Sequence, residues 1–182
     1  MNTLSQYNSA IQSCKDIFIK KASDYGTSWR VLRTISIVDQ IFIKAIRIRN
    51  IQENKEQKVA DDIITEFKGI LNYAIIGLIQ LQYDKAAVED LPVDEVSKSY
   101  DSSAELARKT MLDKNHDYGE AWRDMSQQSF VDLILMKLMR IKQILANDGR
   151  TLISEGIDAN YTDIINYAAF AIILINEGKH TG

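Results

Sequence analysis

The chain has 182 residues, of which 46% are hydrophobic and 26% are charged, and this composition indicates a folded globular protein and excludes a disordered chain. Its formal net charge of -3 lacks the positive excess of a general nucleic-acid binder, so duplex nucleic acid is not the expected partner. The single cysteine, Cys14, excludes an internal disulfide, and the N-terminus lacks the basic and apolar regions of a secretory signal, so we expect a cytoplasmic protein.

The helices that we expect follow from the scarcity of chain-breaking residues. The sequence has one proline, Pro92, and its eight glycines fall mostly at segment ends, which predicts an all-α fold. The first half should form helices at about residues 4–22, 29–52 and 56–82, and the second half at about 101–115, 124–147 and 154–177. Between them, residues 84–100 contain Pro92 and two adjacent acids, and we expect an exposed linker there, in which a short helix can begin after Asp94.

Two segments of the second half are apolar enough to raise the question of a membrane span. The runs at residues 130–145 and 164–175 are both shorter than the roughly 20 residues that a spanning helix needs. The first run also carries Lys137 and Arg140. We therefore expect buried core helices and no contact with a membrane.

The second half of the chain repeats the first. Residues 21–30, with the sequence KASDYGTSWR, return 93 positions later at residues 114–123 as KNHDYGEAWR. Five polar or aromatic residues of the later segments also recur, at offsets of 93 or 94: Asp39 as Asp132, Lys44 as Lys137, Arg47 as Arg140, Asn72 as Asn166, and Tyr73 as Tyr167. We therefore predict a tandem duplication, in which residues 1–83 and 101–182 form two three-helix repeats that pack as a pseudo-two-fold helical bundle.

The retained charges of the two middle helices form the first candidate site. At about 100° per residue, one acid and two bases share a broad face of each helix; these are Asp39, Lys44 and Arg47, and Asp132, Lys137 and Arg140. Because the remainder of each helix is apolar, we expect these charges to be partly buried and to need a partner. Two interpretations stay open: an ion-pair network that links the two repeats, and an anion site in which lysine and arginine bind phosphate.

The third helix of the second repeat forms the second candidate site. Asp163 lies three and four residues before the Asn-Tyr pair, and Glu155 precedes it by about two turns. Because Mg²⁺ prefers carboxylate oxygens and retains several waters, Asp163 and Glu155 are the expected metal ligands and catalytic residues. The first repeat has Gly69 at the position of Asp163, so we expect the second repeat to be the functional one. Acids at a helix start are equally typical of a favourable interaction with the helix dipole.

The loop after the first helix of each repeat forms the third candidate site. Gly26 and Gly119 suit a sharp reversal of the chain, and the tryptophan three positions later suits an anchor on the core. A structural role explains the retained lysine, aspartate and tyrosine less well. Aromatic side chains stack on nucleobases, so we expect a base here with a lysine near its phosphate. The candidate residues are Lys21, Asp24, Tyr25 and Trp29, and Lys114, Asp117, Tyr118 and Trp122.

The three motifs, in this order, resemble a known family. Lys-x-x-Asp-Tyr-Gly-x-x-Trp, Asp-x-x-x-x-Lys-x-x-Arg and Asp-x-x-Asn-Tyr are similar to the nucleotide modification associated domain of bacteria and phages, and the likeness covers both repeats, although the third motif is complete only in the second. More distantly, the chain resembles the MazG-like all-α nucleoside triphosphate pyrophosphohydrolases, which hold Mg²⁺ with clustered carboxylates. Their tandem Glu-Glu-x-x-Glu signature is missing here, because each middle helix has a single acid, Asp39 or Asp132.

Two classes of function follow. The first is a nucleotide-binding protein linked to nucleotide metabolism or modification, which in a catalytic form is a Mg²⁺-dependent pyrophosphohydrolase. Its partner is a nucleotide or modified nucleotide, and its roles would be phosphate binding by Lys137 and Arg140, Mg²⁺ binding by Asp163 and Glu155, base contact by Tyr118 or Trp122, and further ligand contacts by Asn72, Tyr73, Asn166 and Tyr167. The alternative is a non-catalytic structural or protein-interaction module with an internal ion-pair network. Both leave open whether two chains form a homodimer.

Overall fold

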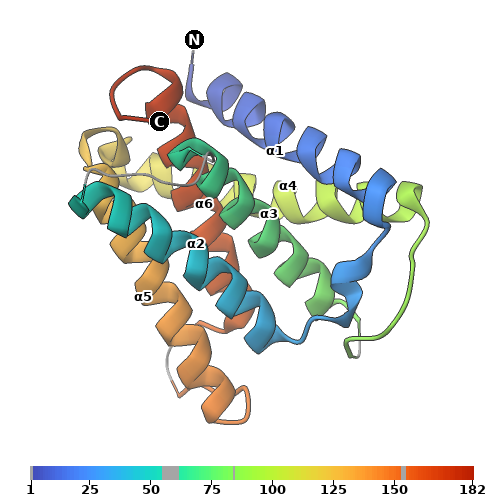
Figure 1. Ribbon diagram of the computed structural model, residues 1–182. Coiled ribbons are helices and arrows are strands. Elements are labelled where there is room, and N and C mark those ends of the chain that lie inside the picture. The colour runs from blue at the N-terminus through green and yellow to red at the C-terminus, as the bar shows by residue number, and fades with distance from the viewer. Residues whose placement is uncertain (1, 55–61, 84, 153–154) are drawn as a thin grey trace.

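The computed structural model describes residues 2–54, 62–83, 85–152 and 155–182. Within these ranges all regular secondary structure is helical, which confirms the predicted all-α class. Six α-helices and two short 3₁₀ helices follow one another along the chain (Figure 1): α1 (Thr3–Tyr25), η1 (Ser28–Val31), α2 (Thr34–Asn54), α3 (Ile63–Leu81), α4 (Val93–Tyr118), η2 (Ala121–Asp124), α5 (Gln127–Ala146) and α6 (Ile157–Asn176).

Local sequence signals set several of these helix ends. The side chains of Asn2, Asp62 and Ser126 each accept a hydrogen bond from a backbone N–H in the first turn of α1, α3 and α5. They satisfy donors that a helix start otherwise leaves without a partner. At the other end, α1 and α4 stop at Gly26 and Gly119, both with φ of 61°, a conformation that favours glycine. The predicted chain reversal at these two glycines is confirmed.

Two predicted helix boundaries were wrong. The first helix of the second repeat begins at Val93 rather than near residue 101, so residues 93–100 are helical. The reason is burial, because these added residues place Val96 and Tyr100 in the core with 1% and 0% of their surface exposed. The helix predicted at residues 29–52 is divided into η1 and α2. The start of the helix predicted at 56–82 lies outside the described residues.

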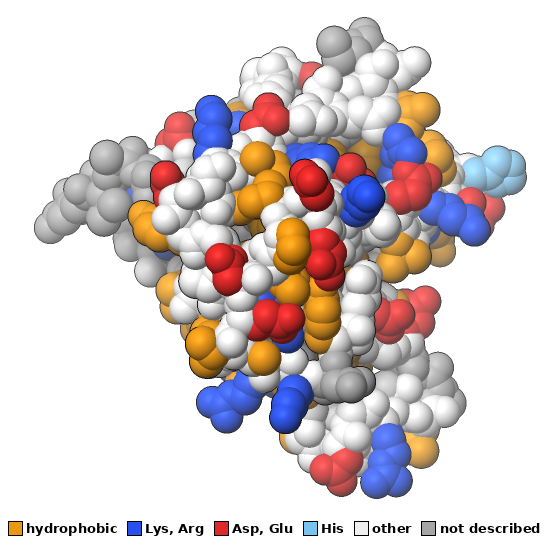
Figure 2. Space-filling view, turned by 90° about the vertical axis from the view of Figure 1, so that its right-hand side faces the viewer, with side chains coloured by type: hydrophobic (Ala, Val, Ile, Leu, Met, Phe, Trp, Pro, Cys, Tyr) orange, Lys and Arg blue, Asp and Glu red, His pale blue; other side chains and the backbone are white. Residues whose placement is uncertain are grey.

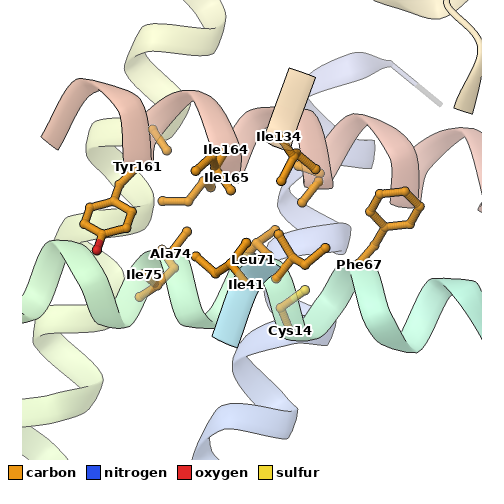
Figure 3. Close-up of a cluster of buried hydrophobic side chains, with 14 of the residues drawn as sticks. Cys14, Ile41, Phe67, Leu71, Ala74, Ile75, Ile134, Tyr161, Ile164 and Ile165 are labelled. Atoms are coloured by element: carbon orange, nitrogen blue, oxygen red, sulfur yellow. The ribbon is translucent and has the colours of Figure 1, made fainter. Parts of the chain in front are cut away.

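The two third helices, α3 and α6, form the centre of the bundle. They make the most extensive contact between any two helices and run antiparallel, as the order of their labelled side chains in Figure 3 shows. The contact is close, because a Cβ atom on Gly77 would lie 2.5 Å from the ring of Tyr161. The helices α2 and α5 pack together on one side of this pair, and α1 and α4 lie on the other (Figures 1 and 3). Buried side chains of both repeats form one continuous core.

Helix α3 is long and apolar enough to cross a membrane on length and composition alone, the one such helix in the described ranges. Within the bundle, however, 72% of its most apolar window is buried. Burial of this kind is typical of a core helix in a globular protein.

The contacts between helices occur in pairs related by the duplication. Within each repeat α2 packs on α3, and α5 packs on α6. The first helices also contact the opposite repeat, because α1 packs on α6 and α4 packs on α3. This exchange of partners gives the pseudo-two-fold arrangement that the sequence predicts.

A pair of equivalent hydrogen-bond networks joins the repeats at these exchanged contacts. The Tyr7 hydroxyl donates to Oδ1 of Asn166 at 2.7 Å, and the Tyr100 hydroxyl donates to Oδ1 of Asn72, also at 2.7 Å. Each asparagine uses its Nδ2 to donate to a carbonyl of its own repeat's first helix, that of Cys14 or Ala107. Burial raises the pKa of both tyrosines, so each hydroxyl stays protonated as a donor.

Removing one of these hydroxyls should destabilise the protein. Tyr100→Phe leaves Oδ1 of the buried Asn72 without its donor, and we expect the free energy of unfolding to fall by about 1–2 kcal/mol. Tyr7→Phe should cost a similar amount. The matched control is Tyr118→Phe, because Tyr118 is 76% exposed. Urea unfolding measures all three, and equal stability of Tyr100→Phe and Tyr118→Phe would contradict the assigned role.

Candidate functional site

A pocket of about 790 Å³ opens in the first repeat, between α1, η1, α2 and α3. Its walls combine residues from all three sequence motifs. Six of the predicted site residues line it: Lys21, Tyr25, Trp29, Lys44, Asn72 and Tyr73. The duplication therefore retained residues that are distant in sequence and meet at one cavity.

Aromatic side chains form part of the wall of this pocket. Trp29 is partly buried, with its ring centroid 6.2 Å from that of Phe18, and Tyr25 is 70% exposed at the end of α1. The Lys44 ammonium lies 5.9 Å from the ring centroid of Tyr73. Ring faces and an ammonium group thus border the same space, which suits a ligand with a flat apolar part and an anionic part.

The positive charge of the pocket exceeds its negative charge. Lys21, Lys44 and Lys68 line it, and Glu66 is the only carboxylate among the described lining residues. Glu66 is itself 6% exposed and binds Arg47 at 3.0 Å, with Lys44 at 3.7 Å. Because Glu66 is bound by Arg47 and Lys44, Lys21 and Lys68 are the lining lysines without a carboxylate partner among the described residues, and both are available to an anion.

The equivalent place in the second repeat is filled by a carboxylate. Asp163 is 6% exposed, and its two oxygens accept hydrogen bonds from Lys114 and Lys137, each at 2.8 Å. Burial alone would lower the pKa of Lys114, but the hydrogen bond and the charge of Asp163 outweigh burial and raise it. Burial, and then the charge of Asp163, raises the pKa of the neighbouring Tyr167. Asp163 and the two lysines form an ion triad in which both carboxylate oxygens have a basic partner.

The loop residues of the second repeat are arranged differently from those of the first. Trp122 is 6% exposed and stacks on Phe170, with ring centroids 4.2 Å apart and planes 6° from parallel. The anchoring role predicted for this tryptophan is confirmed. A cavity of about 1110 Å³ does open in this repeat, and its walls include Lys137, Arg140 and Glu155. None of the candidate residues of the loop after α4, from Lys114 to Trp122, lines it. The exposed aspartates Asp24 and Asp117 line neither described cavity.

The acids of the middle helices pair across the repeats rather than within them. Asp39 accepts from Lys142 at 3.4 Å, and its counterpart Asp132 accepts from Arg49 at 2.5 Å. Lys142 and Arg49 are themselves equivalent positions, so one ion pair occurs twice between α2 and α5. The expectation that these acids would be partly buried was wrong, because their side chains are 56% and 59% exposed. The bases predicted to join these acids pair instead with carboxylates of their own repeats, Lys44 and Arg47 with Glu66 and Lys137 with Asp163.

The predicted ligands Asp163 and Glu155 do not fit a resident Mg²⁺ ion in this arrangement. Two ammonium groups at 2.8 Å occupy the positions around the Asp163 oxygens that a cation would take. Glu155 is an exposed residue in the wall of the separate cavity. Over the described ranges, no three His, Cys, Asp or Glu side chains lie close enough together to hold a metal ion.

Sequence reasoning did not assign a role to Lys68, Tyr7 or Tyr100, and it identified Glu66 only as an acid upstream of Gly69. Glu66 and Lys68 line the pocket, and Glu66 stands one helical turn before Gly69, so the carboxylate of the first repeat is displaced along α3. Tyr7 and Tyr100 recur at an offset of 93, but they lie outside the motifs that attracted attention.

A sequence model of one protein family, described as nucleotide modification associated domain 1, matches the chain twice, at residues 21–81 and 114–175. Together these matches cover 123 of the 182 residues. Each begins at the retained lysine of the loop, Lys21 or Lys114, and extends into the third helix, so each contains the segments of all three motifs. No curated protein and no solved structure gives a significant match to the chain. The two matches confirm the tandem duplication.

The lysines that face the two carboxylates should differ in their effect on stability. Lys137 is only 10% exposed and holds a nearly buried carboxylate, so Lys137→Met should lower the free energy of unfolding by about 2 kcal/mol. Lys44→Met should cost less than about 1 kcal/mol, since Lys44 is 27% exposed and Arg47 still binds Glu66. Thermal or urea unfolding of both variants measures the difference. The reverse order would contradict the assignment.

The ion triad should also produce a pH dependence at alkaline pH. The folded-state pKa of Lys114 is raised above its ordinary value of 10.5, so its contribution is complete below that pH and is lost as the pH rises through the raised pKa. The stability difference between wild type and Lys114→Gln should be below about 1 kcal/mol near neutral pH, because the side chain is 51% exposed. It should shrink only as the pH rises above about 10.5 and through the raised pKa of Lys114. A difference that stays constant over this range would argue against the triad.

Proposed function

The chain belongs to the family of nucleotide modification associated domain 1, and on this premise we propose that it binds a nucleotide in the pocket of the first repeat. The observation that carries the proposal is the meeting of Lys21, Lys44 and Trp29 at that cavity. They come from three separate segments of the chain, and each has a counterpart in the second repeat. The link of the family to nucleotide modification supplies the class of ligand.

The size of the cavity supports a ligand as small as one nucleotide. Pockets for small molecules and cofactors occupy roughly 300–1000 Å³, and this one has about 790 Å³. Its aromatic wall offers Trp29 and the exposed Tyr25 to a base, and stacking contributes about 1–3 kcal/mol per base where it has been measured by substitution. The phosphates would then lie toward the lysines.

The charge distribution favours a free nucleotide over a nucleic-acid strand. A strand needs a basic surface that follows many successive phosphates. The face drawn in Figure 2 instead shows basic and acidic side chains interspersed, with hydrophobic side chains between them. The net charge of -3 agrees with this mixed surface, so the local excess of lysine at the pocket is the feature that a phosphate would recognise.

The proposal is binding rather than hydrolysis. Metal-assisted phosphoryl transfer needs carboxylates that hold the ion and a group that activates water. In the described pocket the one carboxylate, Glu66, is already bound by Arg47 and Lys44. The likeness to pyrophosphohydrolases therefore adds nothing to the function proposed for these residues.

A fluorescence and thermal-shift titration tests the proposal. In a Trp122→Phe background Trp29 is the single tryptophan, so base stacking should change its emission on addition of a nucleotide. The melting temperature should rise by roughly 5–10 °C at a hundredfold excess over Kd, with a metal chelator present.

The two repeats provide the matched controls for this titration. Lys21→Met removes an ammonium group from the pocket wall and should abolish most of the shift, while Lys114→Met changes the equivalent lysine of the second repeat and should leave it intact. No response of the wild type to a panel of ribo- and deoxynucleotides at millimolar concentration would refute nucleotide binding.

A further inference from the structure

One position of the third helix is an aspartate, Asp163, in the second repeat and a glycine, Gly69, in the first. This difference indicates which chemical group of a ligand binds there. In the second repeat, Asp163 lies between Lys114 and Lys137. Its Oδ1 is 2.8 Å from the Lys114 ammonium nitrogen, and its Oδ2 is 2.8 Å from that of Lys137. In the first repeat the equivalent residues are Gly69, Lys21 and Lys44. The two lysines are kept, and the carboxylate between them is absent.

The geometry around Gly69 shows that its side-chain space borders the lysine. A Cβ atom built there would lie 3.0 Å from Cε and 3.2 Å from Nζ of Lys44, and both Gly69 and Lys44 line the pocket. Lys21 forms no ion pair with any residue in the described ranges. The first repeat thus keeps both lysines at the wall of the pocket, and the flexible end of Lys44, rather than a carboxylate, lies against position 69.

We propose that the Asp163 carboxylate permanently occupies, in the second repeat, the place that a terminal phosphate of the nucleotide takes in the first. The inference rests on the proposed function and adds the position of the phosphate and its class. One chain would therefore hold one nucleotide, and the second repeat is a copy of the site closed by its own side chain.

The charges favour a phosphate monoester over a singly charged group. In the second repeat one negative charge faces two lysines. The first repeat adds Lys68 to the wall, where the second has Thr162, so three lysines line the pocket beside its one described carboxylate, Glu66, which Arg47 and Lys44 bind. A terminal phosphate carries about two negative charges near neutral pH and accepts hydrogen bonds on three oxygens. It would therefore balance more of this positive charge than a singly charged group does. A phosphodiester within a strand carries one charge and matches less well.

Exchange of the residues at this position tests the inference. Gly69→Asp places the closing carboxylate in the first repeat and should weaken binding of a nucleoside 5′-monophosphate by more than about tenfold. Gly69→Asn has nearly the same volume without the charge and should weaken binding much less. Both variants change a helical position where the atom met by the new Cβ belongs to a flexible lysine, so both should fold. Equal losses for Asp and Asn would overturn the inference, because volume alone would then explain the effect.

The reciprocal change should create a site. Asp163→Gly frees Lys114 and Lys137, and isothermal titration should show two equivalents of nucleoside monophosphate per chain instead of one. Inorganic phosphate should raise the melting temperature of this variant more than that of wild type or of Asp163→Asn, whose side chain still fills the space.

These results separate the inference from the proposed function. If the wild-type protein binds no nucleotide, the proposed function is refuted. The effect of inorganic phosphate on the melting temperature of Asp163→Gly still tests the closed site directly. A wild type that binds one nucleotide, with Gly69→Asp binding as tightly and Asp163→Gly gaining no second equivalent, would keep the function and overturn the inference. If Asp163→Gly does not fold, the Gly69 pair decides alone.

Discussion

The burial of α3 against α6 at the centre of the bundle is the constraint on which the remaining structure depends. Both helices are apolar over most of their surface, so any polar group that they carry must find its partner inside the protein. Asn72 and Asn166 find theirs in the tyrosines of the opposite repeat, and Glu66 and Asp163 find theirs in basic side chains. The polar residues of the two central helices thus fix how the other four helices lie.

The same constraint separates retained residues with a structural role from those available to a ligand. Both polar atoms of the Asn166 amide are bonded within the protein, so its retention is explained without a ligand. Lys21 has no such partner in the described part of the chain and stands at a cavity wall. Retention through duplication therefore has two physical causes, and the hydrogen-bond partners distinguish them.

Much of the fold followed from the sequence because its determinants are local or repeated. Helical periodicity, the glycines after α1 and α4, and the repeat at 93 residues need no knowledge of the packing. The partner of Asp39 could not be derived in this way, because the register between α2 and α5 brings it to Lys142 rather than to Lys44 of its own helix. The candidate lysines Lys21 and Lys44 line the pocket, but Gly69 was interpreted as a lost ligand. Only the packed structure shows that Gly69 lies at the wall of a pocket, against the side chain of Lys44.

Fusion of the two repeats into one chain has a consequence for how such a site evolves. In a symmetric dimer of single repeats, one codon would specify position 69 and position 163 together, so a carboxylate would close both sites or neither. A fused gene frees each half to vary while the shared core still holds both halves together. The glycine and the aspartate are one result of that freedom. The second repeat can then vary toward a rigid support, while the first repeat keeps its pocket.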